Sequence, residues 1–496
     1  MTAPSARARL PLFVLVFAIL TMLAPAAPLA GYARTIASTA RALVATGTLD
    51  VAPLGDGATL PSTALRHGRR RATSGLGAAL ALVPAEALAA ATRTIDPTAR
   101  IGRAAEAATA GALVALVCVV FFGMLVADGL SARAALFFTL ALAFATPLAW
   151  YGRVPDGTAL ATLLLLVAAR AARAVVSADV VGPADRRAAL ALGLSLGALV
   201  VVEPTLLFAA LVLVAWCGLH RYDRLGAAVA ARVIAPLAAG LVAVVVERWH
   251  AGALPEPRGE LLQGLDGLVL STGKSLFLYA PVLLLAPSAL LRLWRTHRAE
   301  AQLVLAVAAA VLLAAAARDD WHGDPTWGPR RAVPLVPLAL EAIALAWSAR
   351  ATERRGKRST FLALLIAVGI AVQTAGITIS PSTYLNVISE VRVATGAPAW
   401  FGEAPSECHF IPQFSPIIGH AWLLSHLVRH DRRFDVNPPY LLLLSTPPRL
   451  DNVWSRLFVD WFAIGWPPLA AIAWLAALAV AAAAAAWTLR RRLVLA

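Results

Sequence analysis

Long apolar runs recur along the whole 496-residue chain, and no other feature restricts its fold as strongly. Runs of about 18 residues or more are typical of helices that cross a bilayer. Only 14% of the residues are charged and the mean hydropathy is +0.73, whereas a soluble domain has about 25% charged residues. These values exclude an ordinary cytosolic enzyme, a disordered protein and a disulfide-stapled secreted module.

The runs predict an all-α integral membrane protein with about twelve transmembrane helices. The expected spans are 10–30, 104–127, 134–150, 157–175, 188–202, 205–219, 227–248, 276–292, 301–317, 332–348, 359–379 and 463–488. A weaker apolar stretch, 75–91, is interrupted by Pro84 and Glu86. We expect it to form a helix that lies at the membrane interface within a long first outer loop.

Basic residues flank alternate ends of the spans, and this asymmetry predicts the orientation. The clusters expected in the cytoplasm are Arg7, Arg9, Arg133, Arg170, Arg173, Arg186, Arg187, Arg221, Arg224, Arg292, Arg295, Arg298, Arg354, Arg355, Lys357, Arg358, Arg490, Arg491 and Arg492. Both termini are then cytoplasmic, in what we expect to be the inner membrane of a bacterial cell envelope. The net charge of +15 is accounted for by these anchors, so we expect no nucleic-acid partner.

The predicted outer loops hold most of the side chains suited to chemistry. We divide the chain into a transmembrane module over 1–379, with its first outer loop at 31–103, an extracytoplasmic cap over 380–462, and a last span with a basic tail over 463–496. A functional site is therefore expected on the outer face of the membrane.

The segment 319–331 is the most unusual part of the chain, because acids, aromatic residues and arginines crowd between two spans. Arg330 and Arg331 stand where a helix begins at the outer surface, a position suited to a lipid phosphate. The same segment leaves open a divalent metal site, although no helical ligand spacing supports one. Its ligands would be Asp319, Asp320, His322 and Asp324.

The segment Gly267–Ser275 is similar to a phosphate-binding loop, but it has one residue too many between its glycines for the nucleotide-binding motif. ATP binding is therefore not expected. Lys274 and the backbone amides at the start of the 276–292 span remain suited to holding an anion. The alternative is that Lys274 extends to the lipid headgroups.

Two motifs, Gly267–Pro281 and Trp321–Arg330, resemble bacterial multi-span members of the GT-C glycosyltransferase superfamily, relatives of the dolichyl-phosphate-mannose–protein mannosyltransferases. Thr146–Asp156 and the order of the first elements support the resemblance, which covers residues 10–350. It implies a hexosyl or pentosyl transferase. The donor would be a polyprenyl-phosphate-linked sugar, the acceptor would lie on the outer face, and membrane lipids would surround the protein.

The resemblance also implies a carboxylate general base and cations for the leaving phosphate. Family members usually place an acid just after the first span, but Pro28–Arg41 contains none. The base is therefore left open among Asp50, Asp56 and Asp156, and the phosphate contacts are expected to be Lys274, Arg330 and Arg331. The expected substrate pocket consists of Trp321, His322, Asp324, Trp327 and Tyr279.

Two other functions remain as alternatives. A transporter or flippase for a lipid or anionic solute predicts a polar path through the bilayer and repeated halves. The sequence shows no such repeat, and its mid-span positions are nearly all Ala, Leu and Val. The second alternative is a catalytically silent family member that binds a lipid.

Overall fold

The structure is a computed structural model, and part of the chain is described by it. The described residues are 3–25, 31–51, 63–66, 69–73, 75–94, 100–177, 183–221, 227–252, 259–323, 326–348, 355–381, 384–385, 387–389, 407–428 and 468–494. Two residues expected at the site, Asp56 and Asp324, lie outside these ranges, as does most of the predicted cap.

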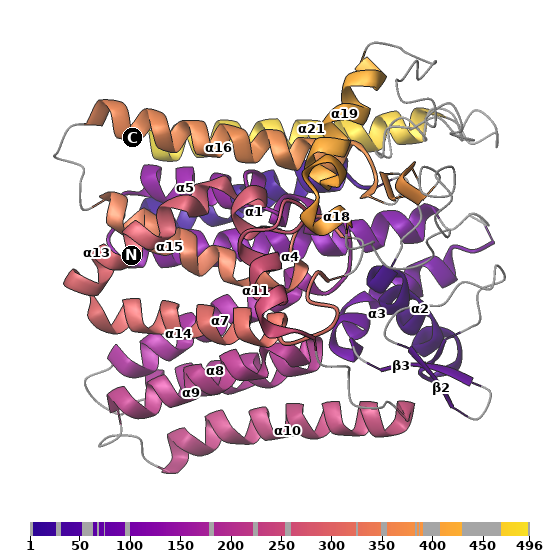
Figure 1. The fold of residues 1–496 in the computed structure, drawn as a ribbon, viewed down its shortest axis with the longest axis horizontal. Coiled ribbons are helices and arrows are strands. Elements are labelled where there is room, and N and C mark those ends of the chain that lie inside the picture. The colour runs from indigo at the N-terminus through magenta and orange to yellow at the C-terminus, as the bar shows by residue number, and fades with distance from the viewer. Residues whose placement is uncertain are drawn as a thin grey trace.

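Long helices lie side by side along one axis of the molecule (Figure 1). They are α1 (Ala3–Met22), α4 (Arg100–Ala127), α5 (Ala132–Phe144), α7 (Thr158–Ser177), α8 (Pro183–Val202), α9 (Leu207–Arg221), α10 (Ala227–Ala251), α14 (Arg298–Ala316), α15 (Val336–Ser348), α16 (Arg355–Thr378) and α21 (Pro468–Leu489). Among the described residues, eight helices are long and apolar enough to cross a membrane. The larger number of spans expected from the sequence is not confirmed.

Prolines explain three places where a predicted span is not one continuous helix. The 276–292 run forms α12 (Leu276–Tyr279), a 3-10 turn η2 (Pro281–Leu285) and α13 (Ala286–Thr296). The 332–348 run starts inside the 3-10 turn η3 (Arg330–Leu335), which contains Pro334. The 134–150 run ends α5 early, and Pro147 precedes the short α6 (Leu148–Tyr151). Proline has no amide hydrogen and its ring clashes with the preceding turn, so it favours the end of a helix at these three places. The helices α1, α3 (Leu76–Ala91) and α10 each continue through one proline.

The first outer loop contains a small sheet that the all-α prediction missed. Its antiparallel strands follow the order β1 (Asp50–Val51), β3 (Arg69–Ala72) and β2 (Thr63–Arg66), with Asp50 opposite Arg71. The helices α2 (Gly31–Thr46) and α3 (Leu76–Ala91) lie beside this sheet at one end of the bundle (Figure 1). The 75–91 stretch is therefore helical as expected, while its place at a membrane interface stays a prediction.

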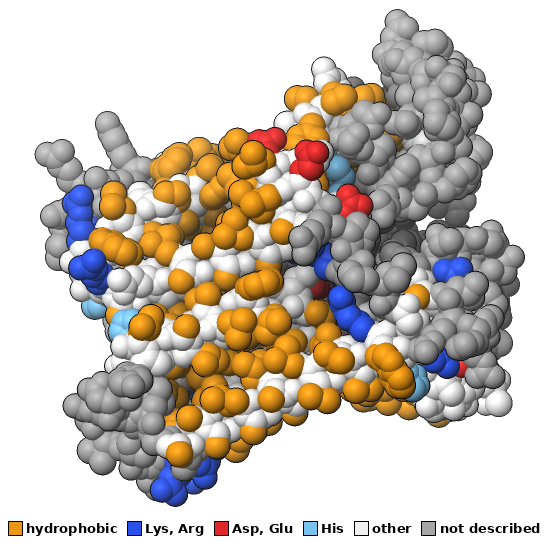
Figure 2. Space-filling model, turned by 60° about the horizontal axis from the view of Figure 1, so that its bottom comes forward, with side chains coloured by type: hydrophobic (Ala, Val, Ile, Leu, Met, Phe, Trp, Pro, Cys, Tyr) orange, Lys and Arg blue, Asp and Glu red, His pale blue; other side chains and the backbone are white. Residues whose placement is uncertain are grey.

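Both chain termini lie at the opposite end of the bundle from α2 and α3 (Figure 1). Figure 2 shows hydrophobic side chains spread over the flank between the ends, with Lys and Arg side chains gathered towards the ends. This arrangement agrees with a membrane normal that runs along the bundle axis. The assignment of the terminal end to the cytoplasm stays a prediction from the basic clusters.

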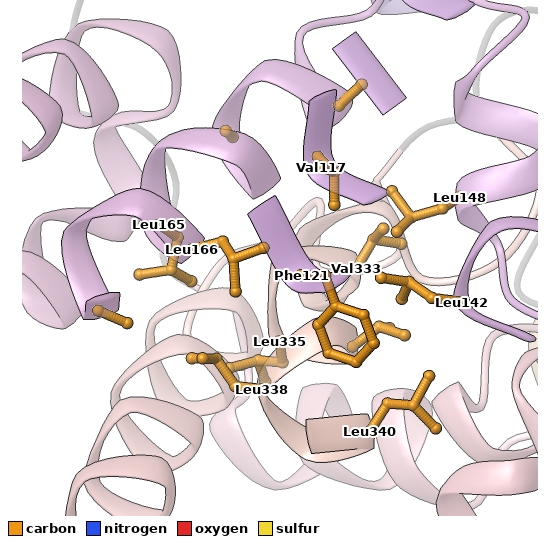
Figure 3. Packing of buried hydrophobic residues seen from close by; sticks show 14 of the residues in the cluster. Val117, Phe121, Leu142, Leu148, Leu165, Leu166, Val333, Leu335, Leu338 and Leu340 are labelled. Atoms are coloured by element: carbon orange, nitrogen blue, oxygen red, sulfur yellow. The ribbon is translucent and has the colours of Figure 1, made fainter. Parts of the chain in front are cut away.

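A buried core at the middle of the bundle fixes the start of the site segment. Phe121 of α4 packs among Leu142 of α5 and Leu338 and Leu340 of α15 (Figure 3). Val333, in η3, belongs to the same cluster. Because the core holds η3 in place, the two arginines at the beginning of η3 have a fixed position at the end of the bundle.

Five further short elements are η1 (Pro204–Leu206), α11 (Leu261–Val269), α18 (Glu407–Phe410), η4 (Pro412–Phe414) and α19 (Pro416–Val428). The chain closes with the π-helical turn η6 (Arg490–Val494) at the terminal end. At the other end, the Glu247 carboxylate of α10 accepts a hydrogen bond of 3.0 Å from the Leu76 amide, which caps the first turn of α3.

Candidate functional site

Asp156 lies in the turn that leads into α7 and is only 1% exposed. Its two carboxylate oxygens accept hydrogen bonds from the Thr158 amide (2.9 Å) and the Thr158 hydroxyl (3.0 Å). Burial raises the pKa of Asp156 to about 6, against the opposing charge of Arg330 and the Thr158 hydrogen bonds. The carboxyl is therefore more basic than an ordinary aspartate and still mostly ionised at pH 7.

Arg330 brings a buried guanidinium into electrostatic reach of Asp156. The side chain is 4% exposed, and its guanidinium carbon lies 4.1 Å from the centre of the Tyr32 ring of α2. One guanidinium nitrogen lies 3.8 Å from the Glu203 carboxylate. Four segments that are far apart in the sequence thus meet around one cation.

Arg331 is held by two carboxylates. Its guanidinium donates to Glu203 at 3.0 Å and forms an ion pair with Asp320. Asp320 also accepts a hydrogen bond of 2.7 Å from Arg318. Burial opposes the ionisation of Glu203, yet Arg331 and then Arg330 lower its pKa below the ordinary value. Both of these carboxylates are therefore ionised and keep Arg331 in a fixed orientation.

Lys274 points into the protein rather than towards headgroups, since it is 2% exposed. Its amine donates to the backbone carbonyls of Thr326 (2.8 Å) and Gly328 (3.2 Å). Gly328 has a φ of +80°, and a Cβ there would lie 3.0 Å from the Tyr279 ring, so only glycine fits this turn. Lys274 thus fixes the turn that directly precedes Arg330.

The expected pocket residues Tyr279 and Trp327 are fully buried beside Lys274. Their rings meet edge to face with centroids 5.1 Å apart, and the Tyr279 hydroxyl donates to the Gly273 carbonyl at 3.0 Å. Tyr151 approaches from α6, where its hydroxyl lies 3.3 Å from the Thr326 hydroxyl. Through these contacts the three rings bridge the segment around Lys274 and the turn that carries Asp156.

Trp321 and His322 face the described part of the predicted cap. The His322 ring stacks on His409 of α18 with centroids 4.7 Å apart, and Trp321 meets His409 edge to face at 5.3 Å. Burial lowers the pKa of His322 to about 4, and the charge of Lys274 acts in the same direction. His322 is therefore neutral at pH 7 and contributes an uncharged aromatic ring.

The described part of the predicted cap packs directly on the loop that is similar to a phosphate-binding loop. The Gly273 amide donates to the His409 carbonyl at 2.9 Å, and the Ser415 hydroxyl donates to the Thr272 carbonyl at 2.7 Å. A Cβ on Gly273 would collide with the Cys408 carbonyl, so this glycine serves the docking contact. Between the two parts lies a small cavity of about 10 Å³. Its lining residues are Lys274, Thr326, Trp327, Pro381, Tyr384, Leu385, Cys408, His409, Pro416 and His420.

Asp50 lies apart from this cluster, in the small sheet. Its carboxylate pairs with Arg71 at 2.6 Å, and Arg71 also donates to the His250 carbonyl at the end of α10. The structure brings Asp156, Lys274, Arg330 and Arg331 to the end of the bundle that also carries the small sheet, and within that sheet Asp50 forms its ion pair with Arg71. In the part of the chain that is described, no three His, Cys, Asp or Glu side chains group in a way that would hold a metal ion.

Two neighbours of Arg330 were not expected at the site. Glu203 is an acid between two apolar runs and directly precedes a proline, which is a visible signal for a buried turn at the end of a span. Tyr32 closely follows the first predicted span. Nothing in the local sequence links either residue to Arg330, because both contacts depend on tertiary packing.

No protein-family model matches the chain, and no curated protein sequence matches it. The structure matches solved structures of ArnT from Cupriavidus metallidurans. For ArnT in the apo state the sequence identity is 15% and the TM-score 0.48, with 86% of this chain and 73% of that chain covered. For ArnT bound to undecaprenyl phosphate the identity is 16% and the TM-score 0.47, with 86% and 71% covered.

Proposed function

We propose that this chain is a membrane glycosyltransferase that moves a sugar from a polyprenyl-phosphate donor to an acceptor on the extracytoplasmic face. The observation that carries the proposal is a cluster at one end of an apolar helix bundle. There the buried guanidinium of Arg330 packs on Tyr32 and lies 3.8 Å from Glu203. The buried carboxylate of Asp156 is within electrostatic reach of this guanidinium. A base and a cation are the two groups that such a transfer requires.

Asp156 is the proposed general base. As the acceptor oxygen attacks the anomeric carbon of the sugar, the hydroxyl proton passes to the Asp156 carboxylate. A pKa of about 6 suits this role, because the group is ionised at neutral pH and holds a proton better than an ordinary aspartate. The buried position of Asp156 also limits competing water around the proton transfer.

Arg330 is the proposed contact to the donor phosphate. The bond between the anomeric carbon and the phosphate oxygen breaks, and polyprenyl phosphate leaves with the bonding electron pair. A planar guanidinium offers two parallel donors to the phosphate oxygens and stabilises the charge that develops there. The Tyr32 ring limits where this guanidinium can lie.

Lys274 and Arg331 support the same site in a different way from that expected. Lys274 donates to two backbone carbonyls, and Arg331 binds Glu203 and Asp320. We therefore propose that Arg330 touches the phosphate, whereas Lys274 and Arg331 hold its segment in place and add positive potential. The polyprenyl tail would lie along the apolar flank of the bundle (Figure 2).

The test is genetic and chemical. Deleting the gene should remove a sugar-bearing envelope product detected by mass spectrometry, and the wild-type gene should restore it. D156N should not restore it, whereas D319N, a change at an exposed aspartate nearby, should. A product that persists with D156N would refute the assignment of the base, and an unchanged glycan profile after deletion would refute the function.

A further inference from the structure

Glu203 occupies the turn between α8 and η1, and its backbone is shaped by the following proline. A residue before proline avoids the helical conformation, and Glu203 has the extended angles φ −143° and ψ 92°. This ends α8 at Val202. The carboxylate is thus presented at the end of the bundle from a rigid turn rather than from a long mobile loop.

The two oxygens of Glu203 face two neighbouring arginines. Oε1 accepts hydrogen bonds from Arg331 at 3.0 Å and from the Thr205 hydroxyl at 2.7 Å. Oε2 lies 3.8 Å from a guanidinium nitrogen of Arg330. Thr205 fixes the rotation of the carboxylate, so each oxygen keeps its own arginine.

Consecutive arginines repel each other when both are buried, and a carboxylate that faces both relieves this repulsion. Asp320 provides a second partner for Arg331, and the Tyr32 ring provides one for Arg330. Among the described residues, Glu203 is the carboxylate that forms ion pairs with both arginines, at 3.0 Å to Arg331 and 3.8 Å to Arg330. Loss of its charge would let the Arg330 guanidinium move relative to Asp156.

We propose that Glu203 is a positioning residue of this site, which holds Arg331 and Arg330 in separate orientations so that Arg330 presents its guanidinium to the donor phosphate. The inference rests on the proposed function, because it assumes that a polyprenyl phosphate binds at Arg330. Glu203 itself does not touch the substrate. Its effect on binding passes through Arg330.

Binding of undecaprenyl phosphate to the full chain in lipid nanodiscs tests this role. E203Q keeps the shape of the side chain and removes its charge, and it should weaken the Kd about tenfold, the effect of one charge-assisted interaction. E203D should recover part of the affinity. E341Q is the matched control, because Glu341 is also a buried partner of an arginine, Arg173, and its substitution should leave the Kd within twofold.

A double-mutant cycle separates positioning from a general structural effect. If Glu203 acts through Arg330, E203Q/R330Q should bind no more weakly than R330Q alone. T205V removes only the hydroxyl that fixes Glu203, so it should weaken binding about threefold. T205V also serves as the test if E203Q does not fold.

Three results would overturn the inference. Wild-type affinity in E203Q, or in T205V if E203Q does not fold, would remove the role of Glu203 while leaving the proposed function intact. Independent, multiplying effects of E203Q and R330Q would show that Glu203 does not act through Arg330. A wild-type chain that binds undecaprenyl phosphate no better than neutral undecaprenol would refute the proposed function, and this inference with it.

Discussion

At the candidate site, cations outnumber carboxylates among the described side chains that are buried or partly buried, whereas around Arg173, towards the other end of α7, carboxylates outnumber the cation. Arg173 forms two parallel hydrogen bonds to Glu341 of 2.6 and 2.8 Å, and Asp128 lies 3.9 Å away. Glu300 adds a further carboxylate within electrostatic reach. A bidentate ion pair of this kind leaves little reason for an outside anion to bind.

The candidate site has the opposite balance of positive and negative side chains. Lys274, Arg318, Arg330 and Arg331 gather there with Asp156, Glu203 and Asp320. Seventeen positions of α7 and its leading turn separate Asp156 from Arg173, which is about 25 Å along a helix. Buried arginines alone therefore do not indicate a phosphate site. In the proposed function, the excess of positive charge beside Asp156, whose pKa is raised by burial, distinguishes the phosphate site from the Arg173 pair.

The largest expected effect is on the rate of transfer, and it concerns Asp156 at the candidate site. D156N should lower the rate of transfer about 10²- to 10⁴-fold, because the base is lost. For the wild type, the rate should fall as the pH drops through about 6, since Asp156 then takes up a proton. Rates of product formation between pH 5 and 8 test both statements, with D319N as the control. A D156N rate close to that of the wild type would contradict the proposal.

A second substitution tests the ion pair between Arg173 and Glu341, towards the other end of α7. R173Q leaves the buried Glu341 without its bidentate partner and should lower the free energy of unfolding by about 3–5 kcal/mol. Binding of undecaprenyl phosphate should stay within twofold of wild type. Melting in detergent and a binding titration measure the two quantities. If the affinity falls along with the stability, the two ends are not independent.

A third change sharpens the role of Lys274. K274M removes the donor from the Thr326 and Gly328 carbonyls and should cost about 1–3 kcal/mol of stability. The affinity for undecaprenyl phosphate should fall less than in R330Q. If K274M melts like wild type but no longer binds, Lys274 contacts the phosphate directly and the structural role assigned to it is wrong.

The smallest expected effect concerns the ring beneath Arg330. Y32L removes a cation–π contact of about 0.5–2 kcal/mol and should weaken binding of undecaprenyl phosphate by between twofold and thirtyfold. Y32F keeps the ring and should bind within twofold of the wild type. Equal affinities for Y32L and Y32F would show that the ring does not position Arg330.

Most of the helices could be predicted because a long apolar run indicates a helix from the local sequence alone. The points at which these runs are interrupted depend on tertiary packing. Pro281 and Pro334 are visible in the sequence, but the 3-10 turns around them form only with the core in place. The small sheet was missed because the strand Arg69–Ala72 is short and mostly arginine, without an apolar alternation.

Part of the candidate site could likewise be predicted from the local sequence. Lys274 and Arg330 stand in recognisable motifs, and Asp156 stands at the start of a span. Glu203 contacts Arg331 across 128 positions of sequence, and no local pattern encodes such a contact. That Lys274 and Arg331 touch the phosphate stays a prediction, and the internal partners that packing supplies to both were not visible in the sequence.

The most direct test is a cryo-EM structure of the chain in nanodiscs with undecaprenyl phosphate. We predict phosphate density within hydrogen-bonding distance of the Arg330 guanidinium, at the end of the bundle that holds Asp156. Phosphate density beside Arg173, or at another place remote from Arg330, would contradict the account.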